Sequence, residues 1–388
     1  MKKILKTLAI VLVIASLATI FASCDEPDDS ALPDDDTSNT DRPDDDNTDD
    51  NNSNTQKPGG DSFIKNESEG LGFIDNNDGT CTITGMGTCT DTDLVIPEKI
   101  DGLKVTSIDK FAFEQNYNIT SVVIPDGVTF INNQAFNSCK KLTKISLPAT
   151  LTKLGTTVFA NCPLLTEIEL PRGLSSIPSN TFSNCTSLKQ IFIPNNIETI
   201  GTYAFYCCTS LERVIIDDGV TSIGDIAFYG CTALKELSLG DSIVSLGKSA
   251  FNGCSALEKV QLPDTLESLS SYVFYKCTSL KTVDLGSGLK SFGKYVFSEC
   301  SALTAIEIPS GVTEITEDSF SKCTSLKSVT LYSGVTDFGW LAFSECTSLT
   351  DINFVGTKAE WESIDKCSDW AHGNGSYTVH CSDGDIVY

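Results

Sequence analysis

One spacing governs this chain: a phenylalanine recurs every 23 residues, and no insertion or deletion interrupts the series. The eleven members are Phe113, Phe136, Phe159, Phe182, Phe205, Phe228, Phe251, Phe274, Phe297, Phe320 and Phe343. A cysteine lies three residues after the phenylalanine in ten copies, and Asn116 takes that place in the first copy. A fixed period of this length is typical of repeat proteins, in which each repeat is one supersecondary unit stacked on the next.

A single 23-residue repeat cannot fold alone. It would bury about seven apolar side chains, worth about 1.5 to 3 kcal/mol each. Ordering its backbone costs about 1 to 2 kcal/mol per residue, which is the larger sum. Stacking lets each repeat bury surface against both neighbours and gives every column the same environment in each copy. We therefore predict a solenoid with one elongated core.

Alternating apolar and polar residues predict one short strand in each repeat. In the copy that starts at Phe136, Ile145 and Leu147 face the core and Ser146 faces solvent. Pro148 ends this strand because it lacks a backbone donor. Copies of the strand should form a parallel sheet along one face, and the rest of each repeat should make a brief helical or irregular return. At about 4.8 Å per parallel strand, the eleven repeats extend over about 50 Å.

The order of these columns resembles the BspA-like leucine-rich repeat family of bacteria, whose pattern is close to C-x-x-L-x-x-I-x-L-P-x-x-L-x-x-I-G-x-x-A-F. The resemblance covers residues 113–354, and residues 94–113 and 356–361 look like the first and last coils of such an array. It implies an α/β-type solenoid, a leucine-rich repeat arc with a parallel β-sheet on one face, 23-residue coils, about eleven repeats and two caps. The caps fall in residues 61–112 and 355–388. The resemblance also implies adhesion to proteins of a host or a neighbouring cell.

The N-terminal residues predict export. Lys2, Lys3 and Lys6 precede a mostly apolar run that is short for a membrane span. The run ends in small residues before Cys24, and this stretch resembles a bacterial lipobox except at Phe21. We therefore expect a signal peptide over residues 1–23 and an acylated Cys24 that anchors the protein to the cell envelope, exposed at the surface. Plain secretion after cleavage nearby and an uncleaved anchor are the alternatives.

Residues 24–60 are expected to form a lipidated, disordered acidic tether. Residues 25–60 hold 13 acidic residues against Arg42 and Lys57, a composition that cannot bury a core. The whole chain has a formal net charge of -25. Such acidity repels nucleic acid and anionic lipid, so we expect no nucleic-acid partner and membrane contact only through the lipid. Calcium binding by the aspartates is an alternative, although their spacing matches no calcium-binding loop of the EF-hand type.

Fifteen of the 16 cysteines fall into three predicted roles, of which the lipid anchor at Cys24 is one; Cys207, beside Cys208 but off the column, has no predicted role. The ten in the repeat column point the same way and lack the converging geometry of a disulfide. We expect them to be buried thiols that act as small apolar side chains. Two further pairs would staple the caps, Cys81 with Cys89 and Cys367 with Cys381.

No catalytic or cofactor site is predicted. His372 and His380 are the only histidines, and both lie beyond the repeats, so no Ser-His or Cys-His couple can form within the coils. With the two cysteines of the C-terminal pair they offer four ligands of types that zinc accepts, but no paired C-x-x-C accompanies them. Glu167 and Glu169 are about 7 Å apart on one predicted strand, which suits two glycosidase carboxylates. Two solvated strand residues are the simpler interpretation, and we expect no enzymatic activity.

The outward residues of the predicted sheet are mostly polar, and one place departs from this pattern. Phe192 and Ile215 face outward on adjacent coils, and Arg213 shares that face. Arg172 lies just past the strand one coil earlier. Single exposed apolar residues are common, but an aromatic residue with arginines is the composition of an interface hot spot. We therefore predict a protein-binding patch of these four residues; a structural or decoy surface protein and a glycan-binding module are the alternatives.

Overall fold

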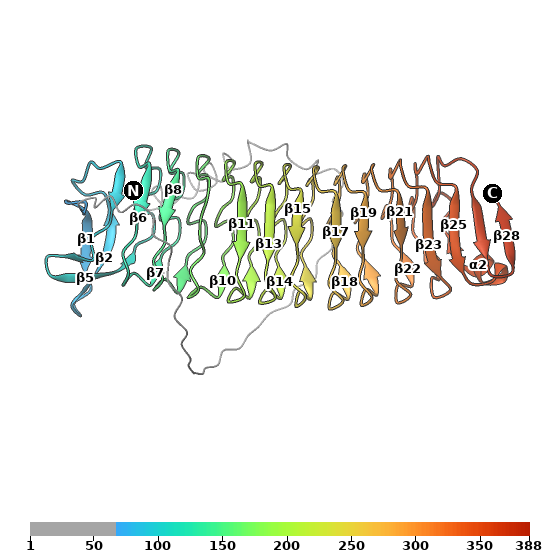
Figure 1. The fold of residues 1–388 in the computed structure, drawn as a ribbon, viewed down its shortest axis with the longest axis horizontal. Coiled ribbons are helices and arrows are strands. Elements are labelled where there is room, and N and C mark those ends of the chain that lie inside the picture. The colour runs from blue at the N-terminus through green and yellow to red at the C-terminus, as the bar shows by residue number, and fades with distance from the viewer. Residues whose placement is uncertain (1–66) are drawn as a thin grey trace, which may run out of the picture. The chain divides into compact units, whose positions relative to one another are not determined.

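A computed structural model describes residues 67–388. The predicted signal peptide (residues 1–23), the anchor Cys24, the tether (residues 24–60) and the first residues of the N-terminal cap (61–66) lie outside the described residues. Figure 1 shows the described part as coils that stack in sequence order, from the blue strands to the red ones. The predicted solenoid of 23-residue coils is confirmed, because consecutive strands pair at that spacing.

The strand that the alternation predicts is present in most coils, and most of these strands pair in parallel with the next one. The strands of this face are β3 (Asp93–Val95), β6 (Ser121–Val123), β8 (Lys144–Ser146), β11 (Gln190–Ile193), β13 (Arg213–Ile216), β15 (Glu236–Ser238), β17 (Lys259–Gln261), β19 (Thr282–Asp284), β21 (Ala305–Glu307), β23 (Ser328–Tyr332), β25 (Asp351–Val355) and β27 (Thr378–Cys381). Tyr332 and Val355 replace the proline that follows the strand in many coils, and there the ladder continues as far as these two residues.

A second set of parallel pairs runs along another side of the coils and was not predicted. Most of its strands are only two residues long, too short for an alternation to be recognised in the sequence. They are β7 (Phe130–Ile131), β9 (Lys153–Leu154), β10 (Ser176–Ile177), β12 (Thr199–Ile200), β14 (Ser222–Ile223), β16 (Ser245–Leu246), β18 (Ser268–Leu269), β20 (Ser291–Phe292), β22 (Glu314–Ile315), β24 (Asp337–Phe338) and β26 (Asp365–Lys366). The return segments, which connect the strands within each coil, are turns. No helix of residues 67–388 has the length and apolar character to cross a membrane.

Strands outside the repeat close both ends of the solenoid. At the N-terminal end, β1 (Gly72–Asp75) pairs antiparallel with β2 (Thr80–Gly85), β2 pairs parallel with β5 (Leu103–Ile108), and β4 (Lys99–Ile100) forms a hairpin with β5. At the C-terminal end, the helix α2 (Lys358–Ser363) precedes β26, and β28 (Gly384–Val387) pairs antiparallel with β27. These elements cover edges that would otherwise be open to pairing with other chains.

The phenylalanine column is a stack of rings through the core. Each of the eleven rings is at most 2% exposed. Consecutive rings stack with centroids 4.9 to 5.7 Å apart and with interplanar angles of 4° to 19°. The ring separation is close to the spacing of the coils, so each phenylalanine packs on the equivalent residue of both neighbours.

The cysteine column is buried and free of disulfides, as predicted. Each Sγ also donates a hydrogen bond to the backbone carbonyl of the phenylalanine one coil earlier, for example Cys231 to Phe205 at 3.3 Å and Cys254 to Phe228 at 3.4 Å. Burial raises the pKa of Cys231 to about 12, so this thiol keeps the proton that it donates. The column therefore links neighbouring coils, a role beyond that of the small apolar side chain predicted from the sequence.

Two positions of every return segment adopt the left-handed backbone conformation. They lie two residues before and two residues after the column phenylalanine, as Ile226 (φ 58°) and Gly230 (φ 69°) do around Phe228. The amide of the first position donates to the next coil, as Ile226 does to the carbonyl of Lys248 at 2.8 Å. Gly230 and Gly253 are the only glycines at these positions. Every other residue there carries a side chain, and its left-handed conformation destabilises the folded state by about 1 to 2 kcal/mol.

We expect Gly253→Ala to lower the free energy of unfolding by about 1 to 2 kcal/mol. Gly253 has φ 74°, and an added Cβ would lie 3.7 Å from Gly230, which is an ordinary contact, so the cost comes from the backbone alone. Gly375→Ala is the control, because a Cβ there meets no atom within 4 Å and its φ is not left-handed. Urea unfolding measures both variants, and equal stability of the two would contradict this account.

Candidate binding site

The sheet of the strand face is interrupted between β8 and β11. These strands belong to separate sheets, and residues 166–170 between them form no strand. The prediction of a strand at Glu167 and Glu169 is therefore wrong. None of the N–H groups of residues 167–170 donates to a backbone carbonyl of the described chain. The coil stays attached at Thr166, whose N–H donates to Thr143 and whose carbonyl accepts from Lys189, both at 3.3 Å.

One local feature sets this coil apart: Pro163 follows the column cysteine. In several other coils the N–H at this position bonds back to the residue two earlier, as Thr232 does to Gly230 and Ser255 does to Gly253, both at 2.8 Å. Pro163 has no N–H. The turn that leads into residues 166–170 is therefore built without this bond.

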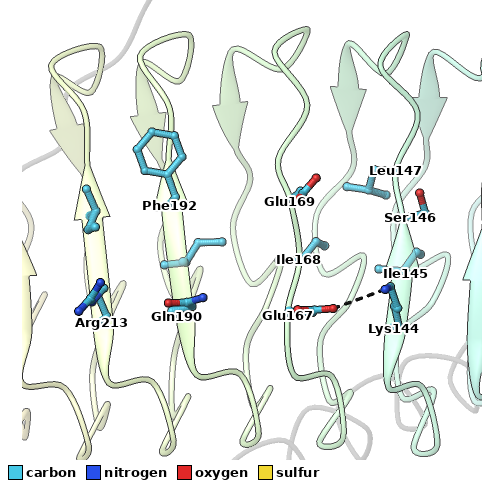
Figure 2. A pocket seen from close by; sticks show the side chains of 12 residues that line it. Lys144, Ile145, Ser146, Leu147, Glu167, Ile168, Glu169, Gln190, Phe192 and Arg213 are labelled. Carbon is cyan, nitrogen blue, oxygen red and sulfur yellow. Dashed lines mark ion pairs between the residues drawn. The ribbon is translucent and has the colours of Figure 1, made fainter. Parts of the chain in front are cut away.

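A pocket of about 460 Å³ opens at the interruption (Figure 2). Its lining residues, which define what we call the gap pocket, are Lys144, Ile145, Ser146, Leu147, Glu167, Ile168, Glu169, Gln190, Ile191, Phe192, Arg213 and Ile215. Inward side chains are accessible here because no backbone ladder joins the coils across the interruption. Leu147 and Leu170 are partly exposed, whereas their counterparts Ile193 and Ile216 on paired strands are buried.

Three of the four patch residues predicted from the sequence meet in the gap pocket. Phe192 is 53% exposed and lies opposite Ile215 in the register of β11 and β13. Arg213 begins β13 and lines the same pocket, as Figure 2 shows. Arg172 is exposed but does not line the pocket, because it follows Pro171 beyond the end of the strand face. The structure therefore brings Phe192, Arg213 and Ile215 together without Arg172.

Ion pairs engage both cations of the gap pocket. Lys144 Nζ lies 3.6 Å from Glu167 Oε1. Arg213 Nε lies 2.7 Å from Glu236 Oε2 on the next coil. These side chains are about half or more exposed, so each pair contributes at most about 1 kcal/mol. Glu169 has neither an ion pair nor a hydrogen bond with any described residue, which leaves it as the uncompensated charge of the pocket.

Two further pockets mark the other interruptions of the same face. Strands β15 and β17 belong to separate sheets, as do β19 and β21. Pockets of about 370 and 540 Å³ lie at these two places. In the second, the Tyr332 hydroxyl donates to Glu307 at 2.7 Å. Neither of them combines an aromatic ring with an arginine, as the gap pocket does with Phe192 and Arg213, so the gap pocket is the stronger candidate for binding.

Neither predicted cap disulfide is present, because all four cap cysteines are free. Cys81 lies in β2 with a buried side chain, and Cys89 lies in the loop that follows. Cys367 follows β26, which pairs with β24, whereas Cys381 ends β27, which pairs with β25. The two C-terminal cysteines therefore belong to different sheets of the solenoid.

The zinc alternative also lacks support. No group of three or more candidate ligands in residues 67–388 is placed to hold a metal ion. Both ring nitrogens of His380 are engaged, with Nε2 2.9 Å from Asp351 Oδ1 and Nδ1 3.1 Å from Asp385 Oδ1. These carboxylates raise the pKa of His380 above its usual value. The histidine thus joins β27 to its neighbours β25 and β28.

Comparison with known proteins identifies the family. The sequence model of the BspA type leucine-rich repeat region, in six copies, matches residues 106–235, 198–311 and 244–367. A leucine-rich cell surface protein from Faecalibacterium prausnitzii is 26% identical, with coverage of 79% of this chain and 99% of its own and a TM-score of 0.48. A leucine-rich repeat protein from Eubacterium ventriosum is 23% identical, with coverage of 82% and 98% and a TM-score of 0.46. The curated proteins gave no match. This chain belongs to the BspA type leucine-rich repeat family.

Proposed function

We propose that this protein binds another protein through the gap pocket and the strand face around it. The observation that carries the proposal is the Phe192 ring, 53% exposed beside partly open apolar side chains on a face that is otherwise mostly polar. Exposed aromatic residues of this kind mark interaction sites and anchor interface hot spots. A leucine-rich repeat solenoid also presents an extended face, which suits a partner as large as a protein.

The proposed role is binding without catalysis. No histidine or cysteine lines the gap pocket, and its Glu167 faces Lys144. The ten column thiols are buried, and burial raises their pKa. These features supply no activated nucleophile or general base at the pocket.

We further propose that the protein is a lipoprotein of the bacterial cell surface and acts as an adhesin. The support lies in residues 1–60, where a predicted export signal (residues 1–23) ends before Cys24 and an acidic stretch precedes the solenoid. Membership of the BspA type family agrees with a binding role at the surface. An acylated Cys24 and the tether would hold the solenoid away from the membrane with its strand face accessible.

Replacing Phe192 with alanine is expected to weaken binding of the protein ligand about 30-fold, because truncating a central aromatic anchor costs about 2 kcal/mol. The ligand is first found by screening extracellular-matrix proteins, bacterial surface proteins and a glycan array against the intact protein. Surface plasmon resonance then measures the affinity of each variant. The melting temperature should not change, since the ring is 53% exposed and its loss leaves no buried cavity.

Val355→Ala is the matched control, because Val355 is also 53% exposed and ends β25 on the same face, outside the gap pocket. Equal affinity of the wild type and Phe192→Ala for the ligand would exclude this pocket as the binding site. A screen in which only glycans bind would favour the glycan-binding alternative. Absence of any ligand would favour a structural or decoy role.

A further inference from the structure

We infer that the gap pocket accepts a basic side chain, arginine or lysine, from an extended segment of the partner, with Glu169 as its counter-ion and Phe192 as its aromatic contact. The inference rests on the proposed function, because it names the chemistry of the partner at that same pocket. It is testable with defined peptides before the partner is known.

The charges of the pocket favour a cation. A cation at Glu169 forms a new ion pair without breaking one that exists, since Glu169 has no partner in the described chain. An anionic group would have to displace Glu167 from Lys144 or Glu236 from Arg213, and it would also lie near Glu169. The whole chain carries 52 acidic against 27 basic residues, so its long-range field also attracts a cationic segment.

The aromatic contact follows from the position of Phe192. Glu169 and Phe192 occupy the same outward column on consecutive coils, and Phe192 lies opposite Ile215 on the next coil. Figure 2 shows Glu169 and Phe192 on neighbouring coils at the same level of the strand face. Both residues line the gap pocket, so a cation bound by the carboxylate lies in the pocket that the ring also lines. A cation gains from the aromatic face and from the carboxylate together.

The pocket also offers contacts for the residues beside the basic one. Leu147 and Ile215 line it and are partly exposed, which provides apolar surface on either side of Glu169 and Phe192. The N–H groups of residues 167–170 have no backbone acceptor within the described chain. They are available to carbonyl groups of an extended segment, as in recognition by strand addition. A basic residue between two apolar residues is therefore the sequence that fits best.

Three short synthetic peptides test the inference on the intact purified protein. All have a Gly-Ser background and a central basic, neutral or acidic residue between two valines: arginine, citrulline or glutamate. Citrulline keeps the shape of arginine and removes the charge. Isothermal titration calorimetry should show the arginine peptide binding about tenfold more tightly than the citrulline peptide, and the glutamate peptide binding most weakly.

Matched variants distinguish the contribution of the gap pocket to peptide binding from that of the protein's overall negative charge. Glu169→Gln should weaken binding of the arginine peptide about fivefold and leave the citrulline peptide unchanged. Phe192→Leu keeps an apolar side chain but removes the ring, and should weaken the arginine peptide about threefold. Glu314→Gln makes the same charge change on the exposed part of β22, on another side of the coils, and should have less than about a twofold effect.

Four results would overturn the inference: no binding of the arginine peptide at millimolar concentration, equal affinity for the arginine and citrulline peptides, equal loss in Glu169→Gln and Glu314→Gln, or tighter binding of the glutamate peptide. The last result would point to Lys144 and Arg213 as the recognition groups. Failure of the proposed function looks different, because there Phe192→Ala binds the partner protein as the wild type does. If Phe192→Ala loses the partner protein and Glu169→Gln does not, the binding function stands and this inference falls.

Discussion

Replacing Phe251 with alanine is expected to lower the free energy of unfolding by about 3 to 5 kcal/mol, measured by urea denaturation. The Phe251 ring is fully buried and stacks on Phe228 at 5.2 Å and on Phe274 at 5.6 Å, with interplanar angles of 4° and 6°. Truncation removes the ring and leaves a cavity, because the other buried side chains hold the neighbouring coils in position. The loss affects both neighbouring interfaces, because every ring of the column contacts the one before and the one after.

Phe251→Leu is the control for this substitution. It keeps an apolar side chain of intermediate size, so we expect the free energy of unfolding to fall less than in Phe251→Ala. Phe192→Ala, the same chemical change at an exposed ring, should leave the stability nearly unchanged. A loss below about 1 kcal/mol in Phe251→Ala would show that the column does not hold the coils together.

Replacing Trp361 with alanine is expected to cost about 3 to 5 kcal/mol and to loosen the C-terminal end of the solenoid. Trp361 is the buried residue of α2, and its ring packs against Phe338 at 5.7 Å and Phe354 at 5.4 Å. Its Nε1–H donates to the Tyr388 hydroxyl at 2.9 Å. Hydrogen exchange measures the result: protection of β25, β27 and β28 should fall, while the amides of β11 and β13 should stay protected.

The locality of this effect follows from the repeat architecture, in which each coil contacts mainly its neighbours. Tyr388→Phe is the control, because it removes only the acceptor of the Trp361 hydrogen bond and should cost about 1 kcal/mol. Unchanged protection of β27 and β28 in Trp361→Ala would show that α2 is not part of the cap. Equal loss along the entire chain would show that the solenoid unfolds as one unit.

The burial of the phenylalanine and cysteine columns and the parallel pairing of the strands were predictable from the sequence, because each depends on one coil packed on a copy of itself. Ile191 and Val214 pair with each other and face inward for the same reason. The thiol hydrogen bonds were not predictable, since they depend on where the carbonyl of the preceding coil lies. The two-residue strands were missed because so short a segment carries no periodic signal.

The spacing of the cap cysteines in the sequence did not show whether they form disulfides. Cys367 and Cys381 are close enough in sequence to pair, but Cys367 follows a strand of one sheet and Cys381 ends a strand of another. A disulfide needs converging Cβ atoms, and that geometry depends on how the last coil folds over the end of the array. The column cysteines differ from the cap cysteines, because their parallel orientation follows directly from the repeat.

The candidate site, too, was predictable from the sequence only in part. The sequence alone specified a solenoid and placed Phe192 and Ile215 outward, because side chains alternate along a strand. It could not show that the ladder opens at residues 167–170, since backbone pairing there depends on the turns and packing of three coils together. Glu167 and Glu169 are both outward acidic residues of one coil in the pattern, yet Glu167 lies beside Lys144 of the preceding coil and Glu169 has no ion pair with a described residue. That difference arises only when the coils are stacked, because the partner of each charge comes from another coil.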